Sequence, residues 1–240
     1  MKMPKIPAIY REIEQLILVP SYSVSQKLIK EVSDRKFKLS TGPLLADCYR
    51  PQHFDTENFH NLIISQFIGA IGPNYIINLL SEFKLKRVLF LGSAGAYSNK
   101  NLPDNNPDFN VCFPNLFLPC WEDAANMLPE KTSLLKVENI LRNSECEIPI
   151  NHETSVSSIN LPTYLNLNLV DEIHKGTNIR IYDMEAAFIA EQVKNLGISF
   201  GCALFITDHH QATIDTPQSV QLAAKSPNFK EVLEYTVSLT

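Results

Sequence analysis

Three observations on the amino-acid sequence predict a single α/β domain with three layers. The 240 residues are 45% hydrophobic and 20% charged, which is typical of one soluble globular domain. Residues 181–210 contain an amphipathic helix followed by an almost continuously apolar strand, and such strands belong to sheets covered on both faces. No internal repeat, low-complexity tract or linker divides the chain. We therefore expect one domain over residues 1–240, with residues 1–14 as an extension on its surface.

The helix and the strand within residues 181–210 have recognisable ends. Asp183 is a residue type that caps the first turn of a helix, and Gly197 follows the last apolar position, where a left-handed residue often ends a helix. The strand covers residues 200–206. Glu185 therefore begins the helix, and Asp208 lies just beyond the carboxyl end of the strand, where ligands bind in open α/β sheets. The apolar face of the helix recurs at helical spacing and consists of Ala186, Ile189, Ala190, Val193 and Leu196.

The first half of the chain predicts further strands and one more helix. Residues 33–59 are polar and proline-containing, so we expect loops and irregular strands there. Pro73 suits the first position of a helix that follows the second strand, and its core face would consist of Ile76, Leu79, Leu80 and Phe83. The expected strands lie at residues 16–19, 61–68 and 87–91. The last of them leads into a turn of small residues at 92–95.

The second half is less regular before residue 181. Pro114 and Pro119 each end a short apolar run, so residues 111–120 are expected to form an edge strand or an irregular segment. Residues 133–141 carry apolar side chains at helical spacing and predict a helix. Residues 148–159 predict a strand that leads into a serine-rich turn.

Charge and cysteine content exclude several functional classes. The formal net charge of −5 provides no basic face for nucleic acid or for an anionic membrane surface. No apolar run approaches the roughly 20 residues that span a bilayer, and the N-terminus does not have the pattern of a signal peptide. The five cysteines are odd in number and have no C-x-x-C spacing. They indicate free thiols in a reducing cytoplasm rather than a disulfide framework.

Two motifs that suggest a metal ion or a dinucleotide are incomplete. Asp208, His209 and His210 lie together, but no third ligand stands at a recognisable spacing, and Val156 replaces the second histidine of an H-E-x-x-H motif. Residues 92–95 (GSAG) lack the G-x-G-x-x-G spacing of dinucleotide-binding folds. We therefore expect no metal and no cofactor, and a Rossmann-type oxidoreductase is disfavoured.

Three blocks of sequence resemble the nucleoside phosphorylase/nucleosidase superfamily. Residues 183–187 (DMEAA), with the helix and strand after them and residues 206–208 (ITD), are similar to the signature of that group. Residues 89–95 (LFLGSAG) and 69–72 (GAIG) form the second and third blocks. The resemblance implies an αβα domain around a mixed, strongly twisted sheet. It further implies a cytoplasmic homo-oligomer, a dimer or a hexamer, that cleaves the N-glycosidic bond of a small purine-type nucleoside.

The resemblance also implies roles for individual residues. Glu185 would accept hydrogen bonds from the ribose hydroxyls while Met184 packs against the sugar, and a carboxylate there favours the positive charge that develops on the ring. Asp208 would protonate the leaving base as a general acid. Gly92 and Ser93 would line the site, with Ser93 facing the attacking water or phosphate. Taken alone, however, Glu185 also fits a carboxylate favoured by the helix dipole, and Asp208 fits a helix cap.

The sequence departs from the superfamily pattern at the nucleophile and at the base. Phe90 and Leu91 stand where phosphorylases carry an arginine for phosphate, and residues 20–25 lack the glutamate with which nucleosidases activate water. Ile159 stands where an aromatic wall for the base is usual. Three alternatives remain open: a nucleosidase, a phosphorylase that uses inorganic phosphate as co-substrate and takes its basic residues from elsewhere, and a protein that binds a nucleoside without cleaving it.

Overall fold

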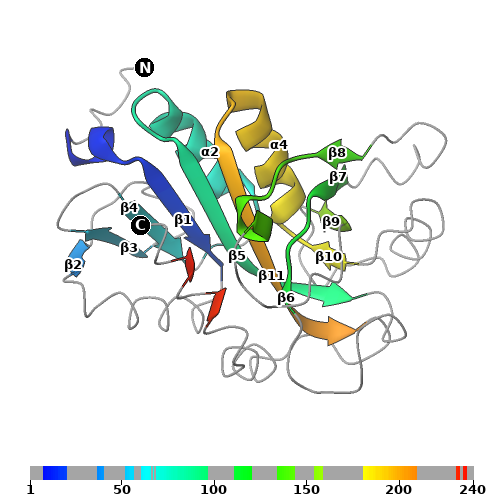
Figure 1. The fold of residues 1–240 in the computed structure, drawn as a ribbon. Helices are drawn as coiled ribbons and strands as arrows, with labels where there is room; N and C mark the ends of the chain where they lie inside the picture. Colours follow the sequence, from blue (N-terminus) through cyan, green and yellow to red (C-terminus); the bar gives the residue numbers. More distant parts are fainter. Residues whose placement is uncertain are drawn as a thin grey trace.

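The computed structural model shows a mixed β-sheet with helices packed against it (Figure 1). The α-helices are α2 (Ile71–Ser81) and α4 (Ala186–Leu196), and the short 3-10 helices are η1 (Ala8–Glu12) and η4 (Ile140–Asn143). None of the helices in this part of the chain is both long and apolar enough to cross a membrane. The structure describes residues 8–20, 37–40, 52–56, 61–65, 67, 69–96, 111–120, 134–143, 154–158, 181–209, 231–232 and 235–236.

Eleven strands of the described chain form one mixed sheet, which contains both parallel and antiparallel pairs. The order along the main path is β2-β3-β4-β1-β5-β10-β9-β7-β8, and β11 pairs with β5 and β6. The strands are β1 (Gln15–Val19), β2 (Phe37–Ser40), β3 (Gln52–Thr56), β4 (Asn61–Ser65), β5 (Arg87–Ala96), β6 (Val111–Cys112), β7 (Leu116–Cys120), β8 (Leu135–Lys136), β9 (Thr154–Ser158), β10 (Ile181–Asp183) and β11 (Ser199–His209).

Strand β5 is the junction of the sheet. It pairs with β11 along nearly its whole length, and with β1 on its other side up to the pair Leu18–Phe90. Further along that side, β10 takes the place of β1 and pairs at Gly95 and Ala96. Among the described strands, none pairs with residues 91–94 on this side of β5. The sheet therefore changes partners beside Ser93, and such switch points are where ligands bind in open α/β sheets.

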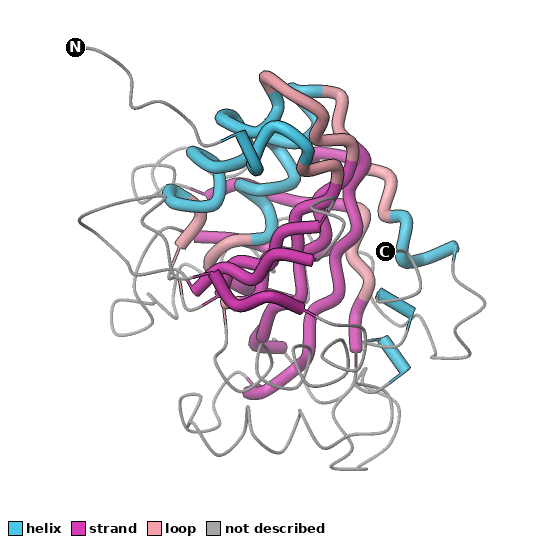
Figure 2. Tube along the Cα trace, turned by 90° about the vertical axis from the view of Figure 1, so that its left-hand side faces the viewer, coloured by secondary structure: helices cyan, strands magenta, loops and turns pink. Residues whose placement is uncertain are grey.

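Both faces of the sheet are covered. Helices α2 and α4 lie side by side on one face, while η4 and the short helical pieces at 231–232 and 235–236 lie on the other (Figure 2). Successive residues of a strand point to opposite faces, yet four successive β5 residues are each 0% exposed: Val88, Leu89, Phe90 and Leu91. Burying a side chain of this size stabilises the fold by about 1.5–3 kcal/mol. The predicted three-layer α/β architecture is confirmed.

The predicted helix in residues 181–210 is confirmed at both ends. The Asp183 side chain accepts hydrogen bonds from the first turn of α4, and Gly197 ends the helix with a φ of 67°. Helix α2 begins at Ile71, two residues before Pro73, where the sequence predicted its start. Its core face contains Ile77 rather than Leu79, which is half-buried.

Strands β5 and β11 are longer than predicted. The expected turn at residues 92–95 is wrong, because β5 continues to Ala96 with β11 beside it. Asp208 was expected beyond the end of its strand, but β11 extends to His209 and contains it. The register between the two strands shifts between Ile206 and Asp208. Small residues in β5 remain extended because neighbouring strands supply their hydrogen bonds, which local composition does not reveal.

The helix predicted at residues 133–141 is wrong, and Asn139 explains why. This segment forms β8 and the beginning of η4 instead. The buried Asn139 amide donates to the carbonyl oxygens of Pro114 and Cys202, both at 2.8 Å, and its oxygen accepts from the backbone nitrogens of Leu141 and Cys202. These bonds hold an irregular segment against β11.

Residues 111–120, expected as an edge strand or an irregular segment, form β6 and β7 with an irregular stretch at 113–115 between them. Among the described strands β6 pairs with β11 alone, whereas β7 has β8 and β9 on its two sides and is not an edge strand.

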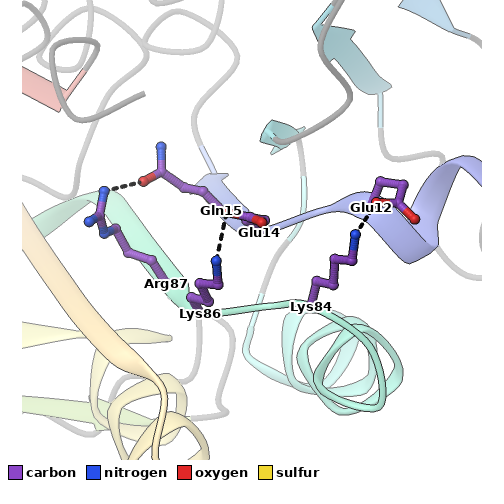
Figure 3. A network of polar contacts seen from close by, with 6 residues as sticks. All are labelled: Glu12, Glu14, Gln15, Lys84, Lys86 and Arg87. Atoms are coloured by element: carbon purple, nitrogen blue, oxygen red, sulfur yellow. Dashed lines mark hydrogen bonds and ion pairs between the residues drawn. The ribbon is translucent and has the colours of Figure 1, made fainter.

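Part of the expected surface extension belongs to the core. Tyr10 and Ile13 are 5% and 0% exposed, so these two side chains belong to the core and not to a surface extension. Polar contacts join this segment to the residues just before β5 (Figure 3), where the ion pairs are Glu12–Lys84 and Glu14–Lys86. Arg87 donates to the Gln15 side chain at 3.0 Å. Exposed ion pairs contribute little to stability, so the buried side chains anchor the segment.

We predict that Asn139→Ala lowers the free energy of unfolding by about 3 kcal/mol, because it leaves buried backbone groups without partners. Chemical denaturation at equilibrium measures the loss. The matched control is Asn78→Ala on α2, where an exposed amide bonds Gln192 and the expected loss is below about 1 kcal/mol. Similar losses in the two variants would contradict the role of Asn139.

Candidate active site

Glu185 is a buried carboxyl group at the beginning of α4. It occupies the N-cap position of the helix and is 7% exposed. Its Oε1 accepts a hydrogen bond of 2.8 Å from the backbone nitrogen of Gly69. Gly69 has a φ of 74°, a conformation that L side chains rarely adopt. This bond joins two of the three sequence blocks, which lie 116 residues apart.

Asp183 lies at the end of β10 and is 6% exposed. Its Oδ2 accepts hydrogen bonds from the backbone nitrogens of Glu185 at 3.0 Å and Ala186 at 2.5 Å. These are two of the N–H groups that the first turn of a helix leaves without intrahelical partners. The other oxygen, Oδ1, is buried and accepts no hydrogen bond within the described structure. Sequence analysis identified Asp183 as a cap but not as part of the site.

The two carboxyl groups hold protons more tightly than exposed ones. Burial raises the pKa of Asp183 to about 7, against the opposing effect of the N–H groups of Ala186 and Glu185. Burial, and next the charge of Asp183, raise the pKa of Glu185 to about 8, while hydrogen bonds from the backbone of Gly69 and Met184 oppose the shift. At neutral pH the pair therefore carries fewer than two negative charges.

The chain segments that carry Glu185 and Asp208 flank the same residue of β5. Tyr182 on β10 and Asp208 on β11 both pair with Gly95 of β5. Adjacent strands lie about 4.8 Å apart, so the backbones of these two residues are about 10 Å apart. The register shift after Ile206 puts Asp208, rather than Thr207, opposite Gly95. The side chain of Asp208 lies outside the described residues.

Ser93 and Gly92 occupy different faces of β5. Ser93 is half-buried and lies two residues before Gly95, so both belong to one face of the strand. Ser93 also adjoins the point where β10 replaces β1. A Cβ on Gly92 would lie 2.5 Å from the Phe90 ring, on the opposite face. The close approach of the Phe90 ring therefore explains why residue 92 is a glycine. Ser93, on the other face, lies beside the switch point.

Tyr182 is a residue at this site that sequence analysis missed. Its ring lies across Gly95, where an added Cβ would come within 2.2–2.4 Å of the ring and the phenol oxygen. The signal in the sequence was the glycine itself, because glycine within a strand often marks a close approach by another group. Ile159, which stands where an aromatic wall for the base is usual, lies outside the described residues.

The structure thus brings together part of the expected site. Glu185, the half-buried Met184 and the Gly69 turn lie at the beginning of α4, and β10 connects them to the Ser93 end of β5. Within the ranges that the structure describes, no group of three histidine, cysteine, aspartate or glutamate residues could hold a metal ion. What remains is a set of buried carboxyl groups beside a sheet switch point, which can bind hydroxyl groups and stabilise positive charge.

We predict that Gly95→Ala displaces the Tyr182 ring and lowers the free energy of unfolding by about 1–3 kcal/mol, the usual cost of overpacking. The control is Gly72→Ala in α2, where a Cβ meets nothing within 4 Å and alanine favours the helix. Denaturation midpoints measure both changes. An unchanged midpoint for Gly95→Ala would show that Tyr182 does not depend on this glycine.

Comparison with known proteins identifies the fold. No protein-family model matches the sequence, and no curated protein is similar to it in sequence. Among solved structures, the chain resembles the 5′-methylthioadenosine/S-adenosyl homocysteine nucleosidase of Campylobacter jejuni, with a TM-score of 0.71 and 14% identity over 94% of this chain and 99% of that one.

Two further structures have the same fold. Futalosine hydrolase of Helicobacter pylori has a TM-score of 0.68 and 15% identity, over 93% of this chain and 98% of that one. Purine nucleoside phosphorylase of Toxoplasma gondii, in complex with immucillin-H, has a TM-score of 0.67 and 17% identity, over 100% of this chain and 98% of that one. The chain therefore has the fold of nucleosidases and purine nucleoside phosphorylases over nearly its whole length.

Proposed function

We propose that this protein cleaves the N-glycosidic bond of a purine-type nucleoside, with water as the nucleophile. The observation that carries the proposal is the buried Glu185 carboxyl group, held by the Gly69 backbone next to the sheet switch point. The fold supports it, because similar structures include a nucleosidase, a futalosine hydrolase and a purine nucleoside phosphorylase. A homo-oligomer in the cytoplasm, without a bound cofactor, fits this proposal.

Glu185 would act at the sugar. A carboxylate can accept two hydroxyl protons at once, which suits the neighbouring 2′ and 3′ hydroxyls of a ribose. As the bond to the base breaks, positive charge develops on the sugar ring, and a nearby carboxylate stabilises it. The interaction is strong because Glu185 is only 7% exposed and water does not screen it. Met184, next in the chain, would pack against the sugar.

Asp208 would act at the base. Cleavage leaves negative charge on the departing purine, and a carboxyl group that donates a proton neutralises it. The register of β11 supports this role, because it places Asp208 opposite Gly95, on the other side of β5 from Tyr182. Across these strands Asp208 lies about 10 Å from Tyr182, which precedes Glu185 by three residues, so the chain segments that carry the two carboxyl groups flank the same stretch of β5.

Water is favoured over phosphate as the nucleophile by the surroundings of β5. Phe90 and Leu91, where the resemblance places a phosphate-binding arginine, are both 0% exposed and cannot contact an anion. Ser93 is half-buried beside the switch point and would orient the attacking water. The phosphorylase alternative would require basic residues from another part of the chain or from a second subunit.

The test is incubation of the purified protein with a panel of purine nucleosides and 5′-thio-nucleosides, with and without phosphate. We expect free base and reducing sugar in buffer without phosphate. Strict dependence on phosphate, with formation of a sugar phosphate, would instead establish a phosphorylase. Saturable binding without release of base over many hours would show that the protein binds a nucleoside without cleaving it.

On the substrate that this panel identifies, we predict that Asp208→Asn lowers kcat by a factor of about 10² or more, the usual scale for loss of a general acid. Glu185→Gln should raise KM and lower kcat, since it weakens both sugar binding and charge stabilisation. Glu191→Gln, further along α4, removes the same charge outside the site and serves as the control. Wild-type rates in both site variants would refute the assigned roles.

A further inference from the structure

Asp183 is a buried acidic group for which the proposed reaction has no role. One of its oxygens caps α4, and asparagine or serine would cap a helix about equally well without burying a charge. Its second oxygen, Oδ1, is buried and receives no hydrogen bond from the described residues. A buried carboxyl oxygen without a partner is costly. Capping alone therefore does not account for a carboxyl group at this position.

Asp183 is connected to Glu185 in two ways. Its Oδ2 accepts a hydrogen bond from the backbone N–H of Glu185, and this bond fixes the position of the backbone that carries the Glu185 side chain. The far end of that side chain is fixed by the backbone of Gly69. The charge of Asp183 also acts on Glu185 directly: burial is the main cause that raises the Glu185 pKa, and the charge of Asp183 raises it further.

Few other ionisable groups surround the pair. On β11, Cys202 interacts with Asp183 and with Cys112 of β6, and burial raises the pKa of both thiols, so both are neutral. No lysine or arginine among the described residues bonds either carboxyl group. Ionisable residues also stand on the elements around the pair: Tyr182 on β10, Tyr75 on α2, Arg87 on β5, Cys120 on β7, Glu191 and Lys194 on α4, and Asp208 and His209 on β11.

We propose that Asp183 is a positioning residue for Glu185, which orders the first turn of α4 and shares a single proton with Glu185. This role rests on the proposed function of Glu185 at the sugar. In the free protein, Glu185 holds the proton. Hydroxyl groups of a bound sugar donate to Glu185 and favour its ionised form, and the proton then resides on Oδ1 of Asp183. Glu185 presents a full negative charge to the sugar, while the buried pair carries one charge instead of two.

The direct test is titration of the two carboxyl groups by NMR, with ¹³C-labelled aspartate and glutamate. In the wild-type protein we expect two linked steps near neutral pH. In Asp183→Asn, which keeps the cap, Glu185 should titrate at least about one pH unit lower, because a neighbouring charge is gone. Glu191→Gln is the control and should leave the Glu185 step in place. Ordinary carboxyl titration in the wild type, or an unchanged Glu185 step in Asp183→Asn, would overturn the proposal.

Enzyme kinetics separate this role from simple capping. On the identified substrate, the acidic limb of the kcat/KM profile should move to lower pH in Asp183→Asn by the same amount as the Glu185 step. Asp183→Ala also loses the cap and should raise KM. An acidic limb in Asp183→Asn that coincides with that of the wild type would mean that Asp183 acts only as a cap and would overturn the proposal. If the wild type cleaves no nucleoside, the proposed function fails. The NMR titration still decides whether Asp183 and Glu185 share a proton.

Stability provides a readout that requires no activity. The folded-state pKa values of both groups lie above their unfolded values, so the folded protein holds more protons between about pH 4 and pH 8. Wild-type stability from this pair therefore falls as pH rises through that window. Asp183→Asn should match the wild type near pH 4 and have the higher urea midpoint at pH 8. A lower midpoint at both pH values would contradict the shared proton.

Discussion

The site depends on the exchange of partners along one side of β5. Strand β1 accompanies β5 as far as Phe90, and β10 replaces it from Gly95 onward, while β11 continues on the opposite side. This exchange brings the beginning of α4 to the carboxyl end of β5. Without it, the carboxyl groups of α4 and the end of β11 would not adjoin the same segment of the sheet. The chemistry that we propose follows from this pairing pattern more than from any single side chain.

Burial of two acidic groups at one helix start opposes stability, and the backbone limits the cost. Asp183 and Glu185 together receive N–H groups from the first turn of α4 and from Gly69. These donors suit an ionised carboxyl group, whereas the apolar surroundings suit a neutral one. The balance keeps both groups close to the point where they gain or lose a proton near neutral pH. Groups tuned in this manner are typical of functional sites.

Local patterns in the sequence were sufficient for α4, for its two ends and for the buried strand after it. Glu185 became a candidate through the resemblance of residues 183–187 to a superfamily signature, because helical periodicity alone fits a carboxylate favoured by the helix dipole equally well. Local patterns failed where the decisive partner is far away in the sequence. Asn139 bonds Cys202 across 63 residues, which prevents the expected helix. Tyr182 covers Gly95, and the neighbours of β5 keep residues 92–95 extended. Periodicity reports on neighbours along the chain, whereas these contacts depend on the assembled sheet.

The register shift near the end of β11 also constrains how this chain can vary. Up to Ile206 the pairing with β5 advances one residue at a time, and a single extra residue precedes Asp208. Removal of that residue, or insertion of another, would exchange the faces of everything after it, because side chains alternate along a strand. A change of length by one residue after Ile206 would therefore turn Asp208 to the opposite face of β11.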